Sequence, residues 1–379
     1  MKILFVSIVG NVLDKNTWSG TTYYLHKHLS NHYEVFQISS LRRLKKPFEI
    51  IVRILNILCN KKILLDTSII LTKLYAFKIK LYLIMHRDID LIISDSSIPL
   101  TFLKSHVKKI VYTDSNFFCM INYYDQFKNL SFGSKRRGNY LEERSLNNVD
   151  KIIYSSEWAK NSSVEAYGIS EAKIHVIPFG LNLDRITNIA EVFERIKIRS
   201  ENYKLKLIFI GRNWIRKGGN IAYKTMLNLR MNHNFDAYLT VIGCLPQLKN
   251  KYVNEVGFLD RNINSDYGYL NNLISESHFL ILPTQADCTP MVCAEANSHG
   301  VPVVVTDTGG VSSIVNNGVN GFLVQDYNNE KGFADRIASV IKNKEKYIKL
   351  CYSSRNYCEN HLTWESNIPK LIDIIESFN

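Results

Sequence analysis

The chain of 379 residues is longer than one hydrophobic core usually organises, so two domains are expected. A hydrophobic fraction of 46% and a charged fraction of 22% are ordinary for a globular protein and exclude low-complexity and collagen-like classes. The net charge of +12 leaves nucleic acid, a membrane surface and anionic small molecules open as partners.

The seven cysteines are odd in number and never form a C-x-x-C pair, which argues against the common zinc and redox motifs. They predict reduced thiols in a cytoplasmic protein. The opening MKILFVSIVG lacks the small-residue cleavage site of a secretory signal, so it predicts a first β-strand. No apolar run approaches the ~18 residues that would suggest a membrane span.

Short β-rich runs alternate with longer helical patterns along the chain. The first series of predicted strands is KILFVSI, YEVFQIS, DLIISD, KIVYTD, KIIYSS and KIHVIPFG, with GTTYYLHKHLSN and SEWAKNSSVEAYG as helices between them. The series restarts after a polar helical connection at 185–201, with the strands LKLIFIGR, AYLTVIG, HFLILPT and VPVVVTD. This alternation predicts an α/β protein with parallel sheets covered on both faces.

We therefore expect two doubly wound domains. The first covers residues 1–184. The second covers residues 203–362, and a C-terminal helix at about 363–379 is expected to pack back onto the first domain.

Ligands of open α/β sheets bind beyond the carboxyl ends of the strands, so the loops that follow strands matter most. The loop GRNWIRKGG after LKLIFI offers Arg212 and Lys217 as cations. After HFLILPT, the segment TPMVCAEANSHG predicts a helix, with Pro290 in its first turn and Gly300 at its end. The N-terminus of that helix could meet a phosphate, which the two cations would also bind.

Two acids bracket this helix start. Asp287 precedes the helix and Glu295 is expected about two turns inside it. One acid would then lie near the anion and the other further along the groove, which suits hydroxyl groups on both sides of a diphosphate. Alternatively, the pair could be a capping acid and a solvated helix residue.

These loops and the motifs after them resemble the retaining nucleotide-sugar glycosyltransferases of family 4. The pattern is G-R-x4-K-G after a strand, then acid-x7-Glu, G-x-P-V, TGG and NGVNGFLV. It is spelled here by Gly211, Arg212, Lys217, Gly218, Asp287, Pro290, Glu295, Gly300, Pro302, Val303, Gly309, Gly310, Asn317, Gly318, Gly321, Phe322 and Val324. The similarity reaches back to WSGTTYYLHKHL and is weakest over 41–87.

The resemblance implies a GT-B architecture, in which two Rossmann-like domains face each other across a cleft. The first domain, residues 1–184, would lie on the acceptor side, and the second would hold the nucleotide sugar. It also implies that Arg212 and Lys217 bind the diphosphate and act in catalysis. Glu295 would bind the ribose hydroxyls. Asp287, which stands where the family usually has Glu, would bind hydroxyls of the transferred sugar and is the third predicted catalytic residue.

Further roles carried by the resemblance concern backbone groups and the first domain. The backbone near Thr289, Pro290 and Met291 would join the phosphate site, and Gly20 would let the first domain's backbone approach the same phosphates. Gly20 could equally serve a strand-to-helix turn. Asp114 stands where many relatives place a His, so it is an acceptor-side candidate or a cap of the next helix.

The expected reaction moves a hexose from a UDP- or GDP-sugar to a hydroxyl of a glycan or lipid-linked glycan. Such a step belongs in bacterial surface-polysaccharide synthesis, either lipopolysaccharide or capsule. No acid is clearly placed as a nucleophile, so attack from the leaving-group face is expected, with the departing phosphate taking the acceptor's proton. Fixed cations then stabilise the diphosphate. No D-x-D motif or His cluster suggests a metal site, so no metal or other cofactor is predicted.

Rival classes share some of these features. A GT-B epimerase or phosphorylase would have the same fold, although no phosphorylase cofactor lysine is found. A nicotinamide dehydrogenase would need G-x-G-x-x-G after the first strand, which SIVGNVLDKNTWSG does not provide. A nucleic-acid-binding protein would explain the charge, but the basic segment lacks interleaved aromatics, so no nucleic-acid partner is predicted.

Eleven lysines and arginines lie in 41–87 against two acids, so most of the net charge is in one segment. Within it, FEIIVRILNILCN predicts a helix with a wide apolar face. We expect Arg42, Arg43, Lys45 and Lys46 to dock the protein on an anionic membrane, peripherally at the inner face of the cell membrane. The alternative is that the apolar face is buried against the sheet and the basic residues form its solvated rim.

Overall fold

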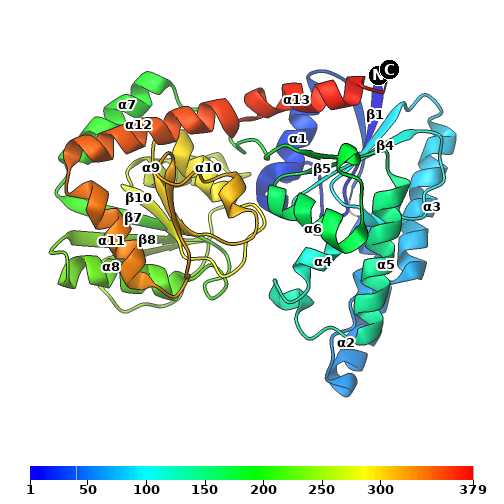
Figure 1. Ribbon diagram of the computed structural model, residues 1–379, viewed down its shortest axis with the longest axis horizontal. Coiled ribbons are helices and arrows are strands. Elements are labelled where there is room, and N and C mark those ends of the chain that lie inside the picture. Colours follow the sequence, from blue (N-terminus) through cyan, green and yellow to red (C-terminus); the bar gives the residue numbers. More distant parts are fainter. Residues whose placement is uncertain (40, 379) are drawn as a thin grey trace. The chain divides into compact units, whose positions relative to one another are not determined.

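The computed structural model describes residues 1–39 and 41–378. Contacts divide the chain into two compact units, Met1–Ile177 with Ile368–Asn379, and Pro178–Asn367. Each unit is built on one six-stranded, all-parallel sheet covered by helices (Figure 1). Within the described part, no helix combines the length and the apolar character needed to cross a membrane.

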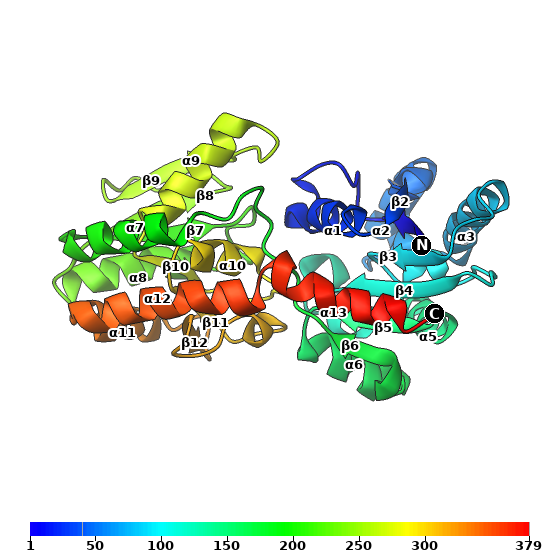
Figure 2. The ribbon, with the colours of Figure 1, turned by 90° about the horizontal axis from the view of Figure 1, so that it is seen from above.

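The sheet of the first unit has the strand order β2-β1-β3-β4-β5-β6. Its strands are β1 (Lys2–Val6), β2 (Glu34–Ile38), β3 (Leu91–Ser94), β4 (Lys108–Thr113), β5 (Lys151–Tyr154) and β6 (Ile174–Val176). Its α-helices are α1 (Thr21–Ser30), α2 (Lys46–Cys59), α3 (Ile69–Met85), α4 (Phe117–Met120), α5 (Phe132–Asn148) and α6 (Glu157–Tyr167), and most of α13 (Trp364–Glu376). In Figure 2, α1 lies on one side of these strands and α3 and α5 on the other.

Short 3-10 helices connect the elements of the first unit. They are η1 (Thr17–Gly20), η2 (Leu41–Lys45), η3 (Leu65–Thr67), η4 (Ile98–Leu100), η5 (Asp125–Phe127) and η6 (Glu171–Lys173). The central strands β1 and β3 consist largely of aliphatic residues that are buried on both faces, as expected when helices cover both sides of a parallel sheet.

The sheet of the second unit has the order β12-β11-β10-β7-β8-β9. Its strands are β7 (Lys204–Ile210), β8 (Asp236–Ile242), β9 (Val253–Gly257), β10 (Phe279–Leu282), β11 (Val303–Thr306) and β12 (Gly321–Val324). Its helices are α7 (Ile189–Glu201), α8 (Gly219–Met231), α9 (Asn264–Ser275), α10 (Met291–Ser298), η7 (Val311–Ser313), α11 (Glu330–Ile341) and α12 (Lys344–His361). Figure 1 shows α7 and α12 on one side of these strands and α8 and α11 on the other.

Each sheet has one point at which the direction of strand addition reverses. In the first sheet β2 lies on one side of β1 and β3 on the other; in the second sheet the reversal falls between β7 and β10. The second order is that of a Rossmann fold, and such switch points are where doubly wound sheets bind ligands. A binding site is therefore expected at the loops after β1, β3, β7 and β10.

All six strands predicted for the first series are present, and all four of the second. The prediction omitted β9 and β12, the two edge strands of the second sheet. The prediction of two doubly wound parallel sheets is confirmed.

Candidate active site

Lys217 and Asp287 form an ion pair at the switch point of the second sheet. Lys217 ends the loop after β7, and Asp287 lies in the loop after β10. The strands are parallel neighbours, with Leu207 opposite Phe279, so their carboxyl ends bring the two loops together. Asp287 is buried and Lys217 is largely buried. The structure thus places two of the three predicted catalytic residues in direct contact.

Two glycines allow this approach. Gly218 has a φ of 73°, and a Cβ there would lie 1.7 Å from the carbonyl oxygen of Pro283. At Gly219, a Cβ would lie 2.0 Å from the ring of Trp214, which packs edge-on against Phe209. Only glycine fits the first position, because it combines a left-handed backbone with a close backbone contact. The sequence Lys217-Gly218-Gly219 therefore lets the start of α8 pack directly against the end of β10.

Backbone contacts tie the two loops together and to a third loop. The Arg216 side chain donates to the carbonyl of Ala286 at 2.6 Å, and the Gln285 amide donates to the carbonyl of Arg216 at 2.8 Å. The Gly310 amide, from the TGG segment after β11, donates to the carbonyl of Asp287 at 3.3 Å. Arg216 therefore joins the loop after β7 to the loop after β10.

Arg212 lies in the same loop but is exposed, and its guanidinium stacks on the ring of Phe258, 4.6 Å from the ring centre. Phe258 directly follows β9. Stacking of this kind restrains a long side chain while its N–H groups remain able to bind an anion. Arg212 and Lys217 thus follow the same strand but have different partners.

Glu295 is the fifth residue of α10 and only 1% exposed. Its carboxylate receives two hydrogen bonds from Arg261, at 2.6 and 2.8 Å, in the bidentate geometry that fixes a carboxylate most firmly. Arg261 follows β9, a strand that the sequence analysis did not predict, so this partner was missed. The sequence feature that could have identified Arg261 is a basic residue shortly after a strand.

The start of α10 is formed by Thr289, Pro290 and Met291, with Pro290 at the N-cap position. The helix is eight residues long and its N-terminus carries the positive end of the helix dipole. Lys217, Asp287 and this helix start therefore surround the ends of β7 and β10. Diphosphate binding by this group stays a prediction.

In the first unit, Gly20 is buried and precedes α1 with a φ of 87°. Trp18 and Ser19 before it also have left-handed backbones, with φ of 47° and 56°. Three such residues in succession are unusual away from functional sites. The left-handed turn before α1 is enough to explain why position 20 is a glycine. A role of Gly20 at the phosphates stays a prediction.

The switch point of the first sheet holds a second buried acid. Asp95, after β3, accepts a hydrogen bond of 2.5 Å from the Ser7 hydroxyl and one of 3.1 Å from the Ile8 amide, both after β1. Burial raises the pKa of Asp95 to about 6, although these hydrogen bonds oppose the shift. Asp114 was predicted as a site candidate because it follows a strand, whereas Asp95, which follows DLIIS in the same way, was missed.

Asp114 follows β4, is half-buried and accepts a hydrogen bond from the Ser115 hydroxyl at 3.0 Å. Asn116 is the N-cap of α4, where its side chain accepts from the Cys119 amide. The alternative that Asp114 caps the next helix is therefore wrong. Its acceptor-side role stays a prediction.

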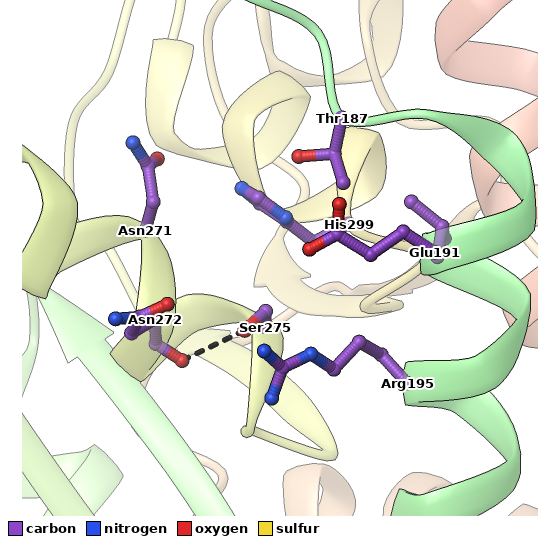
Figure 3. Close-up of a pocket in the computed structure, with 8 residues that line it drawn as sticks. Thr187, Glu191, Arg195, Asn271, Asn272, Ser275 and His299 are labelled. Carbon is purple, nitrogen blue, oxygen red and sulfur yellow. Dashed lines mark hydrogen bonds between the residues drawn. The ribbon is translucent and has the colours of Figure 1, made fainter.

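A separate polar pocket of about 70 Å³ lies between α7 and α9 (Figure 3). Its lining residues are Thr187, Glu191, Val192, Arg195, Asn271, Asn272, Ser275 and His299. His299 Nε2 and Asn271 Oδ1 have no hydrogen-bond partner among the described residues, and the pocket has room for water to supply one. Burial, with Arg199 and Arg355 nearby, lowers the pKa of His299 to about 4. None of the predicted donor-site residues lines this pocket.

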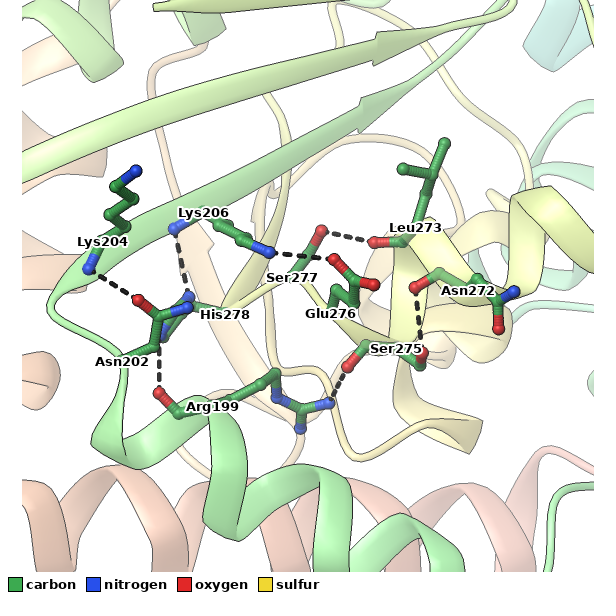
Figure 4. Close-up of polar contacts among 10 residues, drawn as sticks. All are labelled: Arg199, Asn202, Lys204, Lys206, Asn272, Leu273, Ser275, Glu276, Ser277 and His278. Carbon is green, nitrogen blue, oxygen red and sulfur yellow. Dashed lines mark hydrogen bonds and ion pairs between the residues drawn. The ribbon is translucent and has the colours of Figure 1, made fainter.

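The other end of the second sheet is held by a polar network around His278 (Figure 4). Its Nδ1 accepts from the Lys206 amide at 3.1 Å, so its Nε2 donates to the carbonyl of Arg199 at 2.9 Å. Arg199 in turn donates to the carbonyl of Ser275 at 2.6 Å. Burial lowers the pKa of His278 to about 4. This network joins α7, β7 and α9 and is structural.

Within residues 1–39 and 41–378, no three His, Cys, Asp or Glu side chains gather as a metal site would require. Arg212, Lys217 and the start of α10 can supply positive charge to a diphosphate. Metal-independent catalysis nevertheless stays a prediction.

Two family models match the chain, one for each unit. The model described as "Glycosyltransferase Family 4" matches residues 21–185, and "Glycosyl transferases group 1" matches residues 191–357. The chain therefore belongs to the family 4 glycosyltransferases.

Two relatives of the chain share about a quarter of their residues with it over the matched region. Spore coat protein SA of Bacillus subtilis is 23% identical over 256 residues, which cover 62% of this chain and 67% of that protein. The UDP-Gal:alpha-D-GlcNAc-diphosphoundecaprenol alpha-1,3-galactosyltransferase of Escherichia coli is 25% identical over 248 residues, or 62% of each chain. The match thus covers less than two thirds of the second relative.

Three solved structures match over nearly the whole chain. Sucrose-phosphate synthase from Thermosynechococcus elongatus has a TM-score of 0.71 at 15% identity, covering 100% of this chain and 99% of that one. WaaG, a glycosyltransferase involved in lipopolysaccharide biosynthesis, has a TM-score of 0.65 at 13% identity and covers 98% and 99%. HepE of Anabaena, solved with UDP-glucose, has a TM-score of 0.63 at 15% identity and covers 100% of both chains. The chain has the GT-B fold.

Proposed function

We propose that this glycosyltransferase moves a hexose from a UDP- or GDP-sugar to a hydroxyl of a glycan acceptor with retention of the anomeric configuration. The observation that carries the proposal is the arrangement at the switch point of the second sheet. There Lys217, Asp287 and the start of α10 meet, and Glu295 lies one helical turn further along. Positive charge for a diphosphate and a fixed carboxylate for a ribose are thus supplied by the loops after β7 and β10 together with helix α10.

Retention is proposed because Arg212, Lys217 and the start of α10 would surround the leaving diphosphate, on the face from which the acceptor would attack. As the glycosidic bond breaks, negative charge grows on the diphosphate, and preorganised positive groups lower the energy of that state. The acceptor hydroxyl would attack from the same face and pass its proton to the departing phosphate oxygen. Under this scheme neither a carboxylate nucleophile nor a divalent metal is required.

The acceptor is proposed to be a lipid-linked glycan in surface-polysaccharide synthesis, made at the inner face of the cell membrane. Two relatives support this. The Escherichia coli relative acts on a sugar carried by diphosphoundecaprenol, and WaaG is involved in lipopolysaccharide biosynthesis.

The donor is tested by thermal shift with a panel of UDP- and GDP-sugars, since a ligand that binds only the folded state raises its stability. One nucleotide family should raise Tm and the other should not. The linkage of the product made with the positive donor is then assigned by NMR. An inverted anomeric centre would refute retention, and no shift with any sugar nucleotide would refute the donor class.

Metal independence is tested in the same assay. Transfer should continue at an unchanged rate in EDTA, because fixed cations already neutralise the diphosphate. Loss of transfer in the chelator, restored by Mg²⁺ or Mn²⁺, would show that a metal takes part.

A further inference from the structure

Helix α2 leaves most of its described apolar side chains in solvent. Phe48, Ile50, Ile54 and Ile57 are 41%, 71%, 54% and 75% exposed. The side chains of Ile51, Leu58 and Cys59 lie outside the described part. For the residues described, the alternative that this apolar face is buried against the sheet is therefore wrong. An exposed apolar helix face of this kind marks an interaction site.

Helix α3 carries a second exposed apolar stripe. Its members follow the four-three spacing of one helix face and are Ile70, Leu74, Phe77, Leu81 and Ile84, with Met85 beside the last. The opposite face, with Leu71, Tyr75 and Ile79, is buried in the core of the first unit. The stripe is therefore not the face that holds α3 on the sheet. Both α2 and α3 contact η2 and η3, so the two stripes belong to one part of the first unit.

The charge around these stripes is strongly positive. The exposed basic residues here include Arg42, Arg43, Lys46, Arg53, Lys61, Lys62, Lys78 and Lys80. Lys45 differs, because it is partly buried and pairs with Asp66 at 3.3 Å, and Arg42 approaches the same carboxylate at 3.9 Å. Of the four residues named from the sequence, Arg43 and Lys46 are thus the ones best able to meet an external anion.

We propose that the exposed faces of α2 and α3 form a docking surface for an anionic lipid bilayer, with α2 lying in the headgroup region. Apolar side chains would enter the acyl boundary while the surrounding cations meet lipid phosphates. Charge decides between this partner and a second copy of the chain. Two copies would bring two strongly basic surfaces together, whereas an anionic membrane attracts both. The purpose of docking, access to a lipid-linked acceptor, rests on the proposed function.

Vesicle co-sedimentation of the full chain tests the proposal. The probes are vesicles of phosphatidylcholine alone and of phosphatidylcholine with phosphatidylglycerol. The chain should sediment with the anionic vesicles only, and less so as salt rises. Equal binding to both vesicles, or binding to neither, would overturn the proposal.

Two triple variants separate the apolar and the charged contributions. Ile50→Ser, Ile54→Ser and Ile57→Ser together should reduce binding at least tenfold and leave Tm unchanged, because these side chains are exposed. Arg43→Ser, Lys46→Ser and Arg53→Ser should reduce it similarly at low salt. The matched control is Ile198→Ser with Met231→Ser, exposed apolar residues of the second unit, 61% and 68% exposed, which should bind as the wild type does. Binding lost equally in the control would overturn the assignment to α2.

Light scattering and donor binding complete the design. A dimer that disappears in the isoleucine variant, without vesicle binding, would assign the surface to a second copy instead. The shift of Tm with the panel of UDP- and GDP-sugars is measured without lipid. Vesicle binding without any such shift would leave the docking surface standing and refute the proposed donor class, whereas a shift without vesicle binding would overturn the docking surface and leave the donor class standing.

Discussion

Lys217 and Asp287, which are 70 positions apart in the chain, form an ion pair that joins the loops after β7 and β10. The pair holds a cation at the switch point of the second sheet before any donor arrives. A diphosphate bound there would meet a positive group whose position is already fixed, so little reorganisation is needed as charge develops. Asp287 thus positions Lys217, in addition to the sugar contact proposed for it.

Replacing Lys217 with Ala should lower kcat by about two to three orders of magnitude, the scale seen when a charge partner of the transition state is lost. The matched control is Lys206→Ala, which removes a lysine that pairs with Glu276 at the opposite end of β7. That variant should turn over normally. Steady-state kinetics on both variants, with folding checked by Tm, decide the matter. Near-normal turnover of a folded Lys217→Ala would refute the role of Lys217.

The two acids should separate nucleotide binding from transfer. Glu295→Gln weakens the charge-assisted bonds to Arg261 and is expected to weaken binding of both the free nucleotide and the nucleotide sugar. Asp287→Asn removes the charge that pairs with Lys217, so nucleotide affinity should be kept or increased while transfer collapses. Calorimetry with UDP or GDP and with the nucleotide sugar measures both. The reverse pattern would exchange the two roles.

Gly218→Ala should destabilise the protein far more than Gly318→Ala. Both glycines have left-handed backbones, with φ of 73° and 81°, so each variant bears a strain of about 1–2 kcal/mol. A Cβ at Gly318 meets open space, whereas one at Gly218 would clash with the carbonyl of Pro283. Denaturant unfolding of both variants measures the difference. Equal losses would show that the loop relaxes and that the contact with β10 is not required.

His278 should make stability fall in mild acid. Its pKa is about 4 in the folded protein and 6.5 in a model peptide, so the unfolded chain binds the extra proton between these values. The stability that depends on neutral His278 is therefore fully present above about pH 6.5 and is lost as the pH falls towards 4. The full loss is about 3 kcal/mol, at about 1.4 kcal/mol per pKa unit.

The check is urea unfolding of the wild type and His278→Asn at pH 7.5, 6 and 5. Asn can still accept from the Lys206 amide but does not titrate. The difference in free energy of unfolding between the wild type and His278→Asn should shrink steadily as the pH falls. A difference that stays constant across this pH range would contradict the lowered pKa of His278.

The strand pattern of the sequence predicted every strand that is buried between neighbours in the second sheet and missed the two at its edges. β9 and β12 have neighbours on one side only and contain half-exposed residues, such as those of the VNEVG run. An edge strand needs no continuous apolar run, so local periodicity reveals some edge strands, such as β2 and β6 of the first sheet, and misses others. With β9 missed, Arg261 after it could not be placed beside Glu295.

The sequence by itself determined the two parallel-sheet domains, the family resemblance, and the loops that carry Lys217, Asp287 and Glu295. These follow from local patterns: apolar runs, glycines, and charged residues directly after strands. Only the tertiary structure decided which loops meet. Ser7 with Asp95 and Lys217 with Asp287 lie 88 and 70 positions apart, and strand order rather than chain order makes them neighbours. That order results from the pairing of strands that are far apart in the chain. No single stretch of the sequence shows which strands will pair, because the pairing depends on contacts between distant segments.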